Sequence, residues 1–341
     1  MNSWYYFLRL KQLKEYKICK NGGVKIKLTL KTFNFNENIP LGILKQIIDN
    51  EHLLQLQLHK DCEDNVIVNK FTIDEFNEYR ADRKMIYSIL YNPDINRLYG
   101  HICYFLNINE IKPPLYYEYY NKNGIHISQL FVNSSYRNNG VAQNLIGEIE
   151  RYAKHLNISD FDLNTTAKNI VAQNLYKKLN FNIIFSTLSN KKIQRLTSYE
   201  NDYILLNSID NEINTKINNS IRRLMNYFDN GFTFNEIKDH IMKRINNNDY
   251  TIIKSNNDLY AIISINYSKN RIDICDFLLD YDKYNLTNLT TLLDCIYRYA
   301  LSKNLKEIKT AAPIKESDYL KTNFNFIEKV YHLYKGDAQL I

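Results

Sequence analysis

The stretch "SSYRNNGVAQNLI", from Ser134 to Ile146, places an arginine, two asparagines, one glycine and an alanine directly before an apolar-periodic run. The chain has only nine glycines in 341 residues, so the glycine here needs a physical reason. The periodicity predicts a helix over residues 140–156, with Val141 and Leu145 on its apolar stripe. A helix N-terminus has unpaired N–H groups and partial positive charge, which suits an anion such as a diphosphate. Gly140 would let the backbone approach the phosphates, or would adopt a positive φ, without a Cβ in the way.

The pattern around this glycine is Arg137-x-x-Gly140-x-Ala142, and it follows an expected strand at Ile125–Val132. Ala142 would keep the first helical turn narrow, and Arg137 would add positive charge at its rim. Alone, the pattern is short enough to occur by chance, and the simpler interpretation is a glycine that turns a surface loop. A second motif at a fitting distance decides between the two interpretations.

That second motif lies at Asn169–Phe181, and the two motifs together resemble the GNAT superfamily of N-acetyltransferases. The family's phosphate loop, Q/R-x-x-G-x-G/A, corresponds to residues 137–142. Its later motif, N-x-x-A-x-x-L-Y-x-x-x-G-F, corresponds to Asn169, Ala172, Leu175, Tyr176 and Phe181. Asn180 stands where glycine is usual, and asparagine also tolerates the left-handed conformation of a helix end. The resemblance covers roughly residues 98–207.

The resemblance implies acetyl-CoA as cosubstrate, no metal, and an amine acceptor that is either a small molecule or a peptide. In the family, exposed backbone groups of the strand before the loop hold pantetheine, and the N–H of Val132 would polarise the thioester carbonyl. The backbone amides of the loop would hold the pyrophosphate. The coenzyme-binding residues implied in this way are Leu130, Phe131, Val132, Arg137, Asn138, Asn139, Gly140, Val141, Ala142, Gln143 and Asn169.

The resemblance also implies catalytic residues. Tyr176 matches the tyrosine that protonates the thiolate of coenzyme A, and a phenol with a pKa of about 10 stays protonated at neutral pH. The other interpretation of Tyr176 is a tyrosine of the helix core. His126 is the candidate general base, because it occupies a strand position where some members carry a glutamate. Other members place a glutamate at the position of Asn164, which cannot act as a base. Glu118 and a relay of water molecules are the remaining alternatives.

Four short matches recur along the chain in the same order. The offset between the two members of a pair falls from 161 to 147 and then to 143. We interpret the matches as two copies of one fold, with chance similarity in a chain rich in Asn, Lys and Tyr as the alternative. Both members of the first pair contain a capping box, which opens a helix. The pairs are "FTIDEF" and "FTFNEI" from Phe71 and Phe232, "LYG" and "LYA" from Leu98 and Leu259, "IERYA" and "IYRYA" from Ile149 and Ile296, and "YKKLNFN" and "YLKTNFN" from Tyr176 and Tyr319.

These observations predict an α+β fold of two tandem GNAT-like domains, each a mixed central sheet flanked by helices. The expected order in the first copy is β, α, α, β, β, β, α, β, α, β, β, ending with a strand at Tyr203–Ile209. The second copy shows no clear first strand. The expected domains are an N-terminal extension at 1–23, a catalytic domain at 24–209, a linker at 210–216 and a degenerate domain at 217–341.

The second copy lacks the residues of the coenzyme site. The positions that correspond to Arg137, Gly140 and Ala142 carry Tyr284, Thr287 and Leu289. Nearby aspartates, Asp280 and Asp282, would repel phosphates. We therefore expect the second domain to keep the fold without binding coenzyme.

The first copy is 14 residues longer than the second between Gly100 and Ile149, because the offset changes there from 161 to 147. The segment Ile111–Gly124 has two prolines and a cluster of tyrosines, and it ends in an Asn-Gly turn. We expect this insert to lie beside the acceptor site, where aromatic rings would contact an amine. The alternative is a hairpin whose tyrosines extend the core.

The composition excludes several classes. Hydrophobic residues make up 45% and charged residues 24%, as in soluble globular proteins. The net charge of +7 is small and comes without a long basic run, so nucleic-acid binding is not expected. The five cysteines are odd in number and contain no CxxC, which favours a cytoplasmic location over a disulfide framework or a zinc site. The apolar run at the start is too short for a membrane span.

The predicted function is transfer of an acetyl group from acetyl-CoA to a primary amine by direct attack on the thioester. One alternative is a non-catalytic protein that binds or senses acyl-CoA. The other is a scaffold in which neither copy binds coenzyme. These patterns determine neither the acceptor, nor the preferred acyl chain, nor the oligomeric state.

Overall fold

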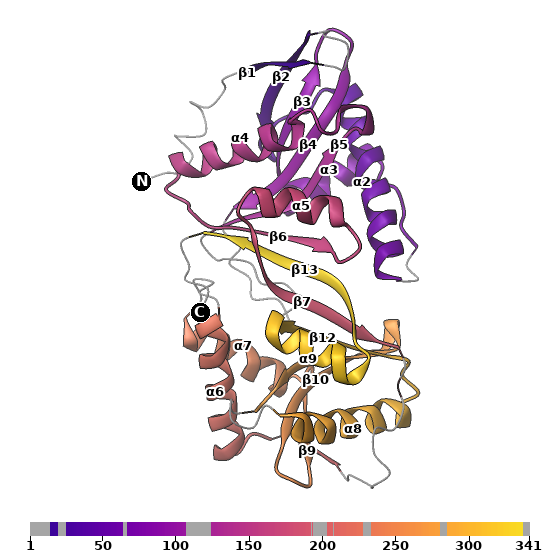
Figure 1. Ribbon diagram of the computed structural model, residues 1–341, viewed down its shortest axis with the longest axis vertical. Coiled ribbons are helices and arrows are strands. Elements are labelled where there is room, and N and C mark those ends of the chain that lie inside the picture. Colours follow the sequence, from indigo (N-terminus) through magenta and orange to yellow (C-terminus); the bar gives the residue numbers. More distant parts are fainter. Residues whose placement is uncertain are drawn as a thin grey trace. The chain divides into compact units, whose positions relative to one another are not determined.

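The repeat in the sequence is also a repeat of secondary structure (Figure 1). In the computed structural model, strand β2 (Lys25–Phe33) opens the order β, α, α, β, β, β, α, β, α, β, and the same order recurs from β8 (Tyr203–Leu206). The structure describes residues 14–19, 25–63, 67–106, 124–191, 193, 203–206, 208–227, 233–279 and 285–336.

The chain divides into two compact units. Unit 1 comprises Met1–Asn107 and Gly124–Leu163, and unit 2 comprises Ile108–Asn123 and Asn164–Ile341. Both units combine a mixed sheet with helices, so the predicted α+β class is confirmed. Among the described helices, none has the length and apolar composition that a membrane crossing requires.

Unit 1 has the strand order β1-β2-β3-β4-β5-β6. Neighbouring strands are antiparallel, except for the parallel pair β5–β6. Strand β6 continues past Leu163 into the range of unit 2. The remaining elements of unit 1 are β1 (Lys14–Cys19), α2 (Leu41–Cys62), α3 (Ile73–Asp82), β3 (Ile86–Asn92), β4 (Arg97–Leu106), β5 (Ile125–Val132), the short 3-10 helix η1 (Ser134–Tyr136), α4 (Val141–His155) and β6 (Phe161–Thr166).

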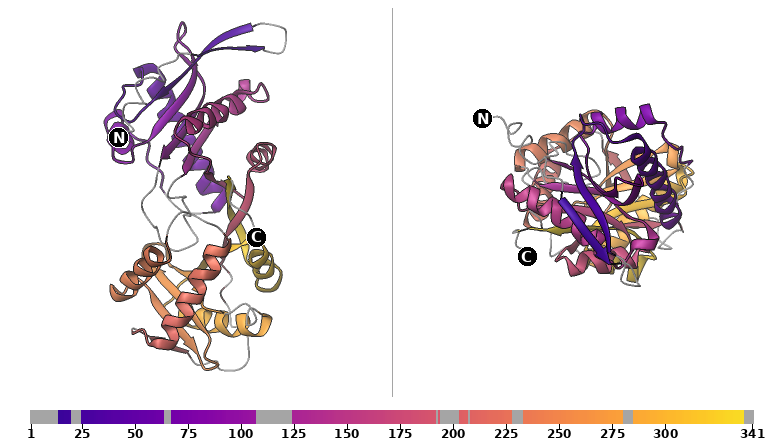
Figure 2. Two further views of the ribbon diagram at one scale, coloured as in Figure 1. Left: turned by 90° about the vertical axis from the view of Figure 1, so that its left-hand side faces the viewer. Right: turned by 90° about the horizontal axis from the view of Figure 1, so that it is seen from above.

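Helices cover both faces of this sheet (Figures 1 and 2). On one face, α2 and α3 pack with the side chains of Tyr87, Ile89 and Cys103. On the other face, α4 lies so close to Gly100 that a Cβ there would be 2.9 Å from Val141 Cγ1. Successive strand residues point to opposite faces. Gly100 and Cys103 are three positions apart in β4, so Gly100 faces α4 and Cys103 faces α2 and α3.

Unit 2 has the strand order β13-β7-β12-β11-β10-β9-β8, in which only β11 and β12 are parallel. Its other elements are α5 (Ile170–Lys178), β7 (Asn182–Asn190), α6 (Asn211–Tyr227), α7 (Phe234–Asn246), β9 (Thr251–Ser255), β10 (Tyr260–Asn266), the 3-10 helix η2 (Tyr267–Lys269), β11 (Arg271–Phe277), α8 (Leu286–Ser302), β12 (Glu307–Pro313), α9 (Ile314–Phe324) and β13 (Ile327–Lys335).

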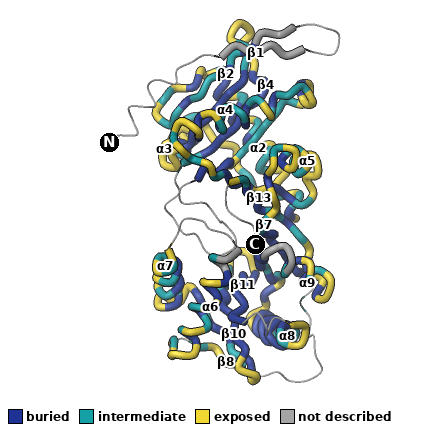
Figure 3. The backbone as a smooth tube through the Cα atoms, turned by 60° about the vertical axis from the view of Figure 1, so that its left-hand side comes forward, coloured by how far each residue is buried: buried dark blue, intermediate teal, exposed yellow. Residues whose placement is uncertain are grey.

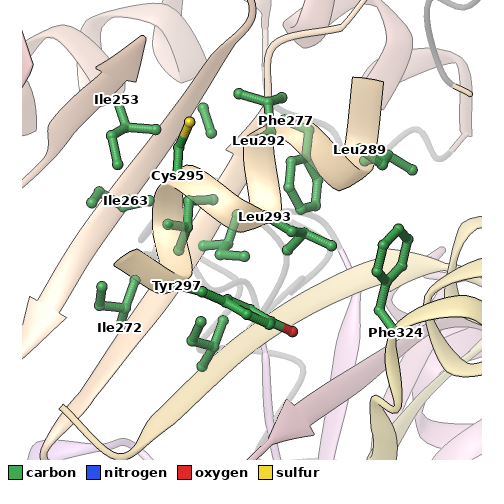
Figure 4. Packing of buried hydrophobic residues seen from close by; sticks show 14 of the residues in the cluster. Ile253, Ile263, Ile272, Phe277, Leu289, Leu292, Leu293, Cys295, Tyr297 and Phe324 are labelled. Atoms are coloured by element: carbon green, nitrogen blue, oxygen red, sulfur yellow. The ribbon is translucent and has the colours of Figure 1, made fainter. Parts of the chain in front are cut away.

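The core of unit 2 is centred on α8. Leu289, Leu292 and Leu293 of this helix pack with isoleucines of the neighbouring strands, as Figure 4 shows. Both units bury their strands and expose the outer sides of their helices (Figure 3). Burial of apolar side chains of this kind contributes roughly 1.5–3 kcal/mol for each large residue.

The capping boxes predicted for the two copies are confirmed. In α3, Glu75 N donates to Thr72 Oγ1 and Thr72 N donates to Glu75 Oε2. In α7, Thr233 and Glu236 make the same pair of bonds at the same lengths. The repeat is therefore a repeat of local chemistry as well as of element order.

The pairing of strand β7 places the boundary between the two units elsewhere than the sequence predicted. By sequence β7 belongs to the first copy, but it pairs antiparallel with β12 on one side and β13 on the other. Its buried polar side chains have partners there too, since Asn190 Nδ2 donates to Tyr297 Oη at 2.9 Å. The boundary between the units consequently falls at Leu163, and not near residue 209.

Four further expectations differ from the structure or can be compared with it only in part. The strand expected to close the first copy is β8, which pairs with β9 and serves as the first strand of the second copy. The expected linker at 210–216 is largely the start of α6. Of the N-terminal extension at 1–23, the described part is β1, which pairs antiparallel with β2. The insert at Ile111–Gly124, with Glu118, lies outside the described residues except for Gly124.

Candidate active site

Strand β5 is paired along its whole length on one side only. Against β4 the register shifts between Cys103 and Tyr104, which leaves Ser128 as the extra residue of a β-bulge. Against β6 the pairing covers Ile125–Ile127 alone. A bulge bends the strand that contains it. Within the described part of the chain, the edge of β5 from Ser128 to Val132 therefore has no strand partner on the β6 side.

The backbone of Val132 points to this open edge. Asn133 N donates to Tyr99 O on β4 at 3.0 Å. Because consecutive strand residues direct their N–H and C=O groups to opposite edges, those of Val132 and Leu130 face away from β4. The Nε of Arg137 donates to Val132 O at 3.2 Å, as this orientation requires. Arg137 therefore fastens the loop to the end of β5.

The loop between β5 and α4 contains two left-handed residues, Asn138 with φ 62° and Gly140 with φ 75°. A Cβ on Gly140 would meet a single neighbouring atom, Gln143 Oε1 at 3.6 Å. The glycine is therefore needed for its backbone conformation and not to avoid crowding within the chain. The predicted positive φ at Gly140 is confirmed.

The N-terminus of α4 has no side-chain cap, a feature that it shares with α2 and not with the other helices whose caps are described. Helices α3, α5, α7 and α8 each begin with a side chain that accepts a hydrogen bond from the first turn. Helix α4 begins at Gly140 without a side-chain cap and without an acidic residue in its first turn. Its first N–H groups and its partial positive charge are thus free to bind an anion beside the open edge of β5.

His126 is paired with an aspartate that the sequence analysis did not single out. The Nδ1 of His126 and Oδ1 of Asp162 form a hydrogen bond between side chains that are 7% and 6% exposed. The two residues are register partners, one position before the β5–β6 pairing ends. The ring of Phe105 stacks on His126 at 5.0 Å between centroids. Asp162 and Phe105 therefore fix the orientation of the imidazole.

A second polar group lies on the α2 face of the same strands. Glu51 is 3% exposed and stands on the helix stripe that contains Ile47 and Ile48. The hydroxyl of Tyr87 donates to it, and so does the side chain of Gln129. Desolvation raises the pKa of Glu51 to about 7, against the lowering effect of these two bonds. A carboxylate on an otherwise apolar stripe was the signal that could have revealed this group.

The raised pKa of Glu51 predicts a pH-dependent stability. A carboxyl whose folded pKa lies above its unfolded value stabilises the fold most when protonated, so stability is lost as pH rises from about 4.5 through 7. The shift corresponds to about 3 kcal/mol. Glu51→Gln should gain that much free energy of unfolding over the natural chain at about pH 8, and little at about pH 4.5, in urea titrations at both pH values. The exposed Glu78, changed to glutamine, is the control and should show no such dependence. An equal gap at both pH values would contradict the burial argument.

The remaining predicted residues, Asn169 and Tyr176, lie in unit 2, at the start of α5 and within it. The side chain of Asn169 caps this helix by accepting from Ala172 N at 3.1 Å. The helix ends at Lys178, and Asn180, just past the C-cap Leu179, has a φ of 64°, as predicted for an asparagine that replaces glycine. Phe181 N then donates to Tyr176 O at 3.0 Å, and the Phe181 and Tyr176 rings lie 5.7 Å apart. These contacts form a Schellman motif with its hydrophobic pair, which fixes the Tyr176 side chain.

Tyr176 is 6% exposed, and burial raises its pKa above the ordinary value for tyrosine. Among the described residues, its hydroxyl has no hydrogen-bond partner. The phenol therefore stays protonated at neutral pH and keeps its proton to donate. Described histidine, cysteine and carboxylate side chains form no group of three or more that could hold a metal ion.

The second copy has the same kind of unpaired strand edge as the first, but it lacks the anion site. The parallel pairing of β11 with β12 ends at Ile274, as that of β5 with β6 ends at Ile127. The following helix, α8, is capped by Asn285, whose side chain accepts from Asn288 N at 3.0 Å. Asp276 in the opening forms a buried ion pair with Arg223, at 2.9 Å. The cap occupies a first-turn N–H group of α8, which disfavours a bound phosphate.

The comparisons with known proteins agree with this geometry. The family model described as "Acetyltransferase (GNAT) family" matches residues 55–181. A GCN5-related N-acetyltransferase from Sphaerobacter thermophilus has a similar fold, with a TM-score of 0.52 at 9% identity, over 92% of this chain and 97% of that one. A glucosamine N-acetyltransferase region of a fungal multi-domain GH3 beta-N-acetylglucosaminidase gives a TM-score of 0.50 at 10% identity, over 91% of this chain and 38% of that one. No curated protein sequence matches this chain.

Proposed function

We propose that this chain, whose residues 55–181 match the model of the GNAT acetyltransferase family, transfers an acetyl group from acetyl-CoA to a primary amine. Acyl transfer from acetyl-CoA is the general chemistry of that family. The observation that carries the proposal is the uncapped N-terminus of α4, opened by the left-handed Gly140, beside the unpaired edge of β5. The acceptor would be a small molecule or a peptide, and the compartment the cytoplasm, in keeping with an odd number of cysteines and no CxxC motif.

The coenzyme would bind along two adjoining features of unit 1. The amides from Asn138 to Gln143 and the charge of Arg137 would hold the diphosphate. The open edge of β5 would hold the pantetheine arm by the backbone groups of Leu130 and Val132, on either side of Phe131. The N–H of Val132, directed to that edge, would stabilise the negative charge that develops on the thioester oxygen. Asn169 is carried over from the family motif.

The reaction needs one proton acceptor and one proton donor. His126 would take the proton that the acceptor ammonium must lose, and it would do so at Nε2, because Nδ1 contacts Asp162. The amine nitrogen then attacks the carbonyl carbon, the C–N bond forms and the C–S bond breaks. Tyr176 would protonate the departing thiolate. The helices of the second copy would bind no coenzyme of their own.

Gly140 provides the first test. Gly140→Asn adds a side chain where the diphosphate must approach, and asparagine tolerates the positive φ, as Asn138 shows with φ 62°. Its Kd for acetyl-CoA, measured by calorimetry, should rise at least about tenfold, which is about 1.4 kcal/mol. The control Gly147→Ala lies in the same helix, where an added Cβ meets no atom within 4 Å. It should keep the natural Kd, as should Thr287→Asn in the second copy. An unchanged Kd in Gly140→Asn would remove the phosphate-loop assignment.

A further inference from the structure

Four side chains form a buried polar group between α2 and the sheet of unit 1, here called the Glu51 cluster: Glu51, Tyr87, His101 and Gln129. Tyr87 joins its members, because its hydroxyl donates to Glu51 and its ring lies 6.0 Å from that of His101. Gln129 donates to Glu51 from the first position of β5 beyond the bulge. The cluster therefore touches the strand whose other edge is proposed to hold the coenzyme.

Several polar atoms of the Glu51 cluster have no hydrogen-bond partner within the described part of the chain. They are both ring nitrogens of His101, which is fully buried, and Oε1 of Gln129. Buried polar atoms in proteins nearly always have partners, so unpaired ones need an explanation. Here they belong to residues linked to the carboxylate of Glu51, His101 through the Tyr87 ring and Gln129 directly, and the ring of Phe131 stacks on His101 at 5.6 Å.

The chemistry of these atoms selects one kind of ligand. The carboxylate of Glu51 and the amide oxygen of Gln129 accept hydrogen bonds and do not donate. Burial lowers the pKa of His101 to about 3, so its ring is neutral and one nitrogen accepts. A primary ammonium has three N–H donors and a positive charge that complements Glu51, and the faces of Tyr87 and Phe131 suit a cation.

We propose that the Glu51 cluster receives the ammonium group of the acceptor. The inference rests on the proposed function, since it names the part of the site that selects amines. It also fits the position of His126, which stacks on Phe105, a residue that packs with the α2 face of the sheet. The ammonium would then bind on the same face as the base that takes its proton. A neutral alcohol would lack both the charge and two of the donors.

Methylamine and methanol are suitable probes, because the cluster is buried and these are the smallest pair that differs in the charged group. Ring signals of 15N-labelled histidine would be followed by NMR at about pH 8, where Glu51 is ionised and a primary amine is still charged. The His101 signals, assigned with His101→Gln, should shift saturably with methylamine and stay unchanged with methanol. In Glu51→Gln the Kd for methylamine should rise at least about tenfold.

Glu78→Gln is the matched control, since it removes one exposed carboxylate from α3, and it should keep the natural Kd. If Glu51→Gln does not fold, Gln129→Leu serves instead and should also weaken binding. Equal shifts with methanol, or a methylamine Kd that neither cluster variant changes, would overturn the inference. The readout needs no turnover, so failure of the acetyltransferase proposal would show separately, as absence of acetylation with every amine.

Discussion

Replacing His126 with glutamine should lower kcat for acetyl transfer by about 10²-fold or more, while the Kd for acetyl-CoA stays within about twofold. Glutamine is similar in size and can still bond to Asp162, but it cannot take up a proton. His126 lies at the start of β5, and the loop that would bind the diphosphate follows the other end of this strand, so coenzyme binding should not depend on it. The kcat is measured by release of coenzyme A thiol, and the Kd by calorimetry.

Asp162→Asn tests the positioning of the same imidazole. It should lower kcat by about tenfold or more through a misoriented ring, without changing the Kd for acetyl-CoA. Imidazole added in solution should restore part of the activity of His126→Ala, a rescue that a purely structural role would not permit. His155→Gln, at the exposed end of α4, is the control and should be unaffected. Natural kcat in His126→Gln would favour a water relay or Glu118 as the base.

The local features of the site follow from its residues alone. Gly140 and Asn180 adopt the positive φ that their surroundings in the motifs indicate, and both capping boxes form with the bonds that their spacing predicts. These features depend on residues within a few positions of one another. Short patterns that recur at offsets of 143 to 161 residues likewise identified the repeat of element order.

The features that escaped prediction depend on contacts between distant segments. Nothing within β7 shows that it pairs with β12 and β13, since its alternation fits any partner of suitable register. Asp162 looks like an ordinary exposed residue between Phe161 and Leu163 until the parallel register with β5 places it against His126. Glu51 acquires its raised pKa from burial against the sheet, a property of packing and not of the helix that carries it.

Tyr176→Phe should lower kcat by about 10²-fold, because the hydroxyl is the proposed donor to the thiolate and phenylalanine keeps the ring. The Schellman motif with Phe181 should survive, since it uses the ring and the backbone of Tyr176. The hydroxyl has no partner among the described residues, so the variant should be as stable as the natural chain. Rates are compared at saturating acetyl-CoA, with thermal unfolding as the check on stability.

Tyr319→Phe is the matched control for this change. Tyr319 occupies the corresponding place in the second copy, on α9, and its ring also lies near a phenylalanine, at 6.4 Å from Phe324. The change is chemically identical, but the second copy has a capped α8 and no proposed coenzyme site. It should leave kcat unchanged. A natural kcat in Tyr176→Phe would assign the protonation of the thiolate to water or to another residue.

The most direct test of acetyl transfer is a single incubation of the full chain with acetyl-CoA and a panel of primary amines. Free coenzyme A thiol and acetylated amine are measured together, and binding of acetyl-CoA is measured in parallel by thermal shift. We predict equal amounts of thiol and acetylated product with at least one amine, abolished by His126→Gln together with Tyr176→Phe. Binding of acetyl-CoA without acetylation of any amine would identify a coenzyme-binding protein instead, and failure to bind acetyl-CoA would contradict the account altogether.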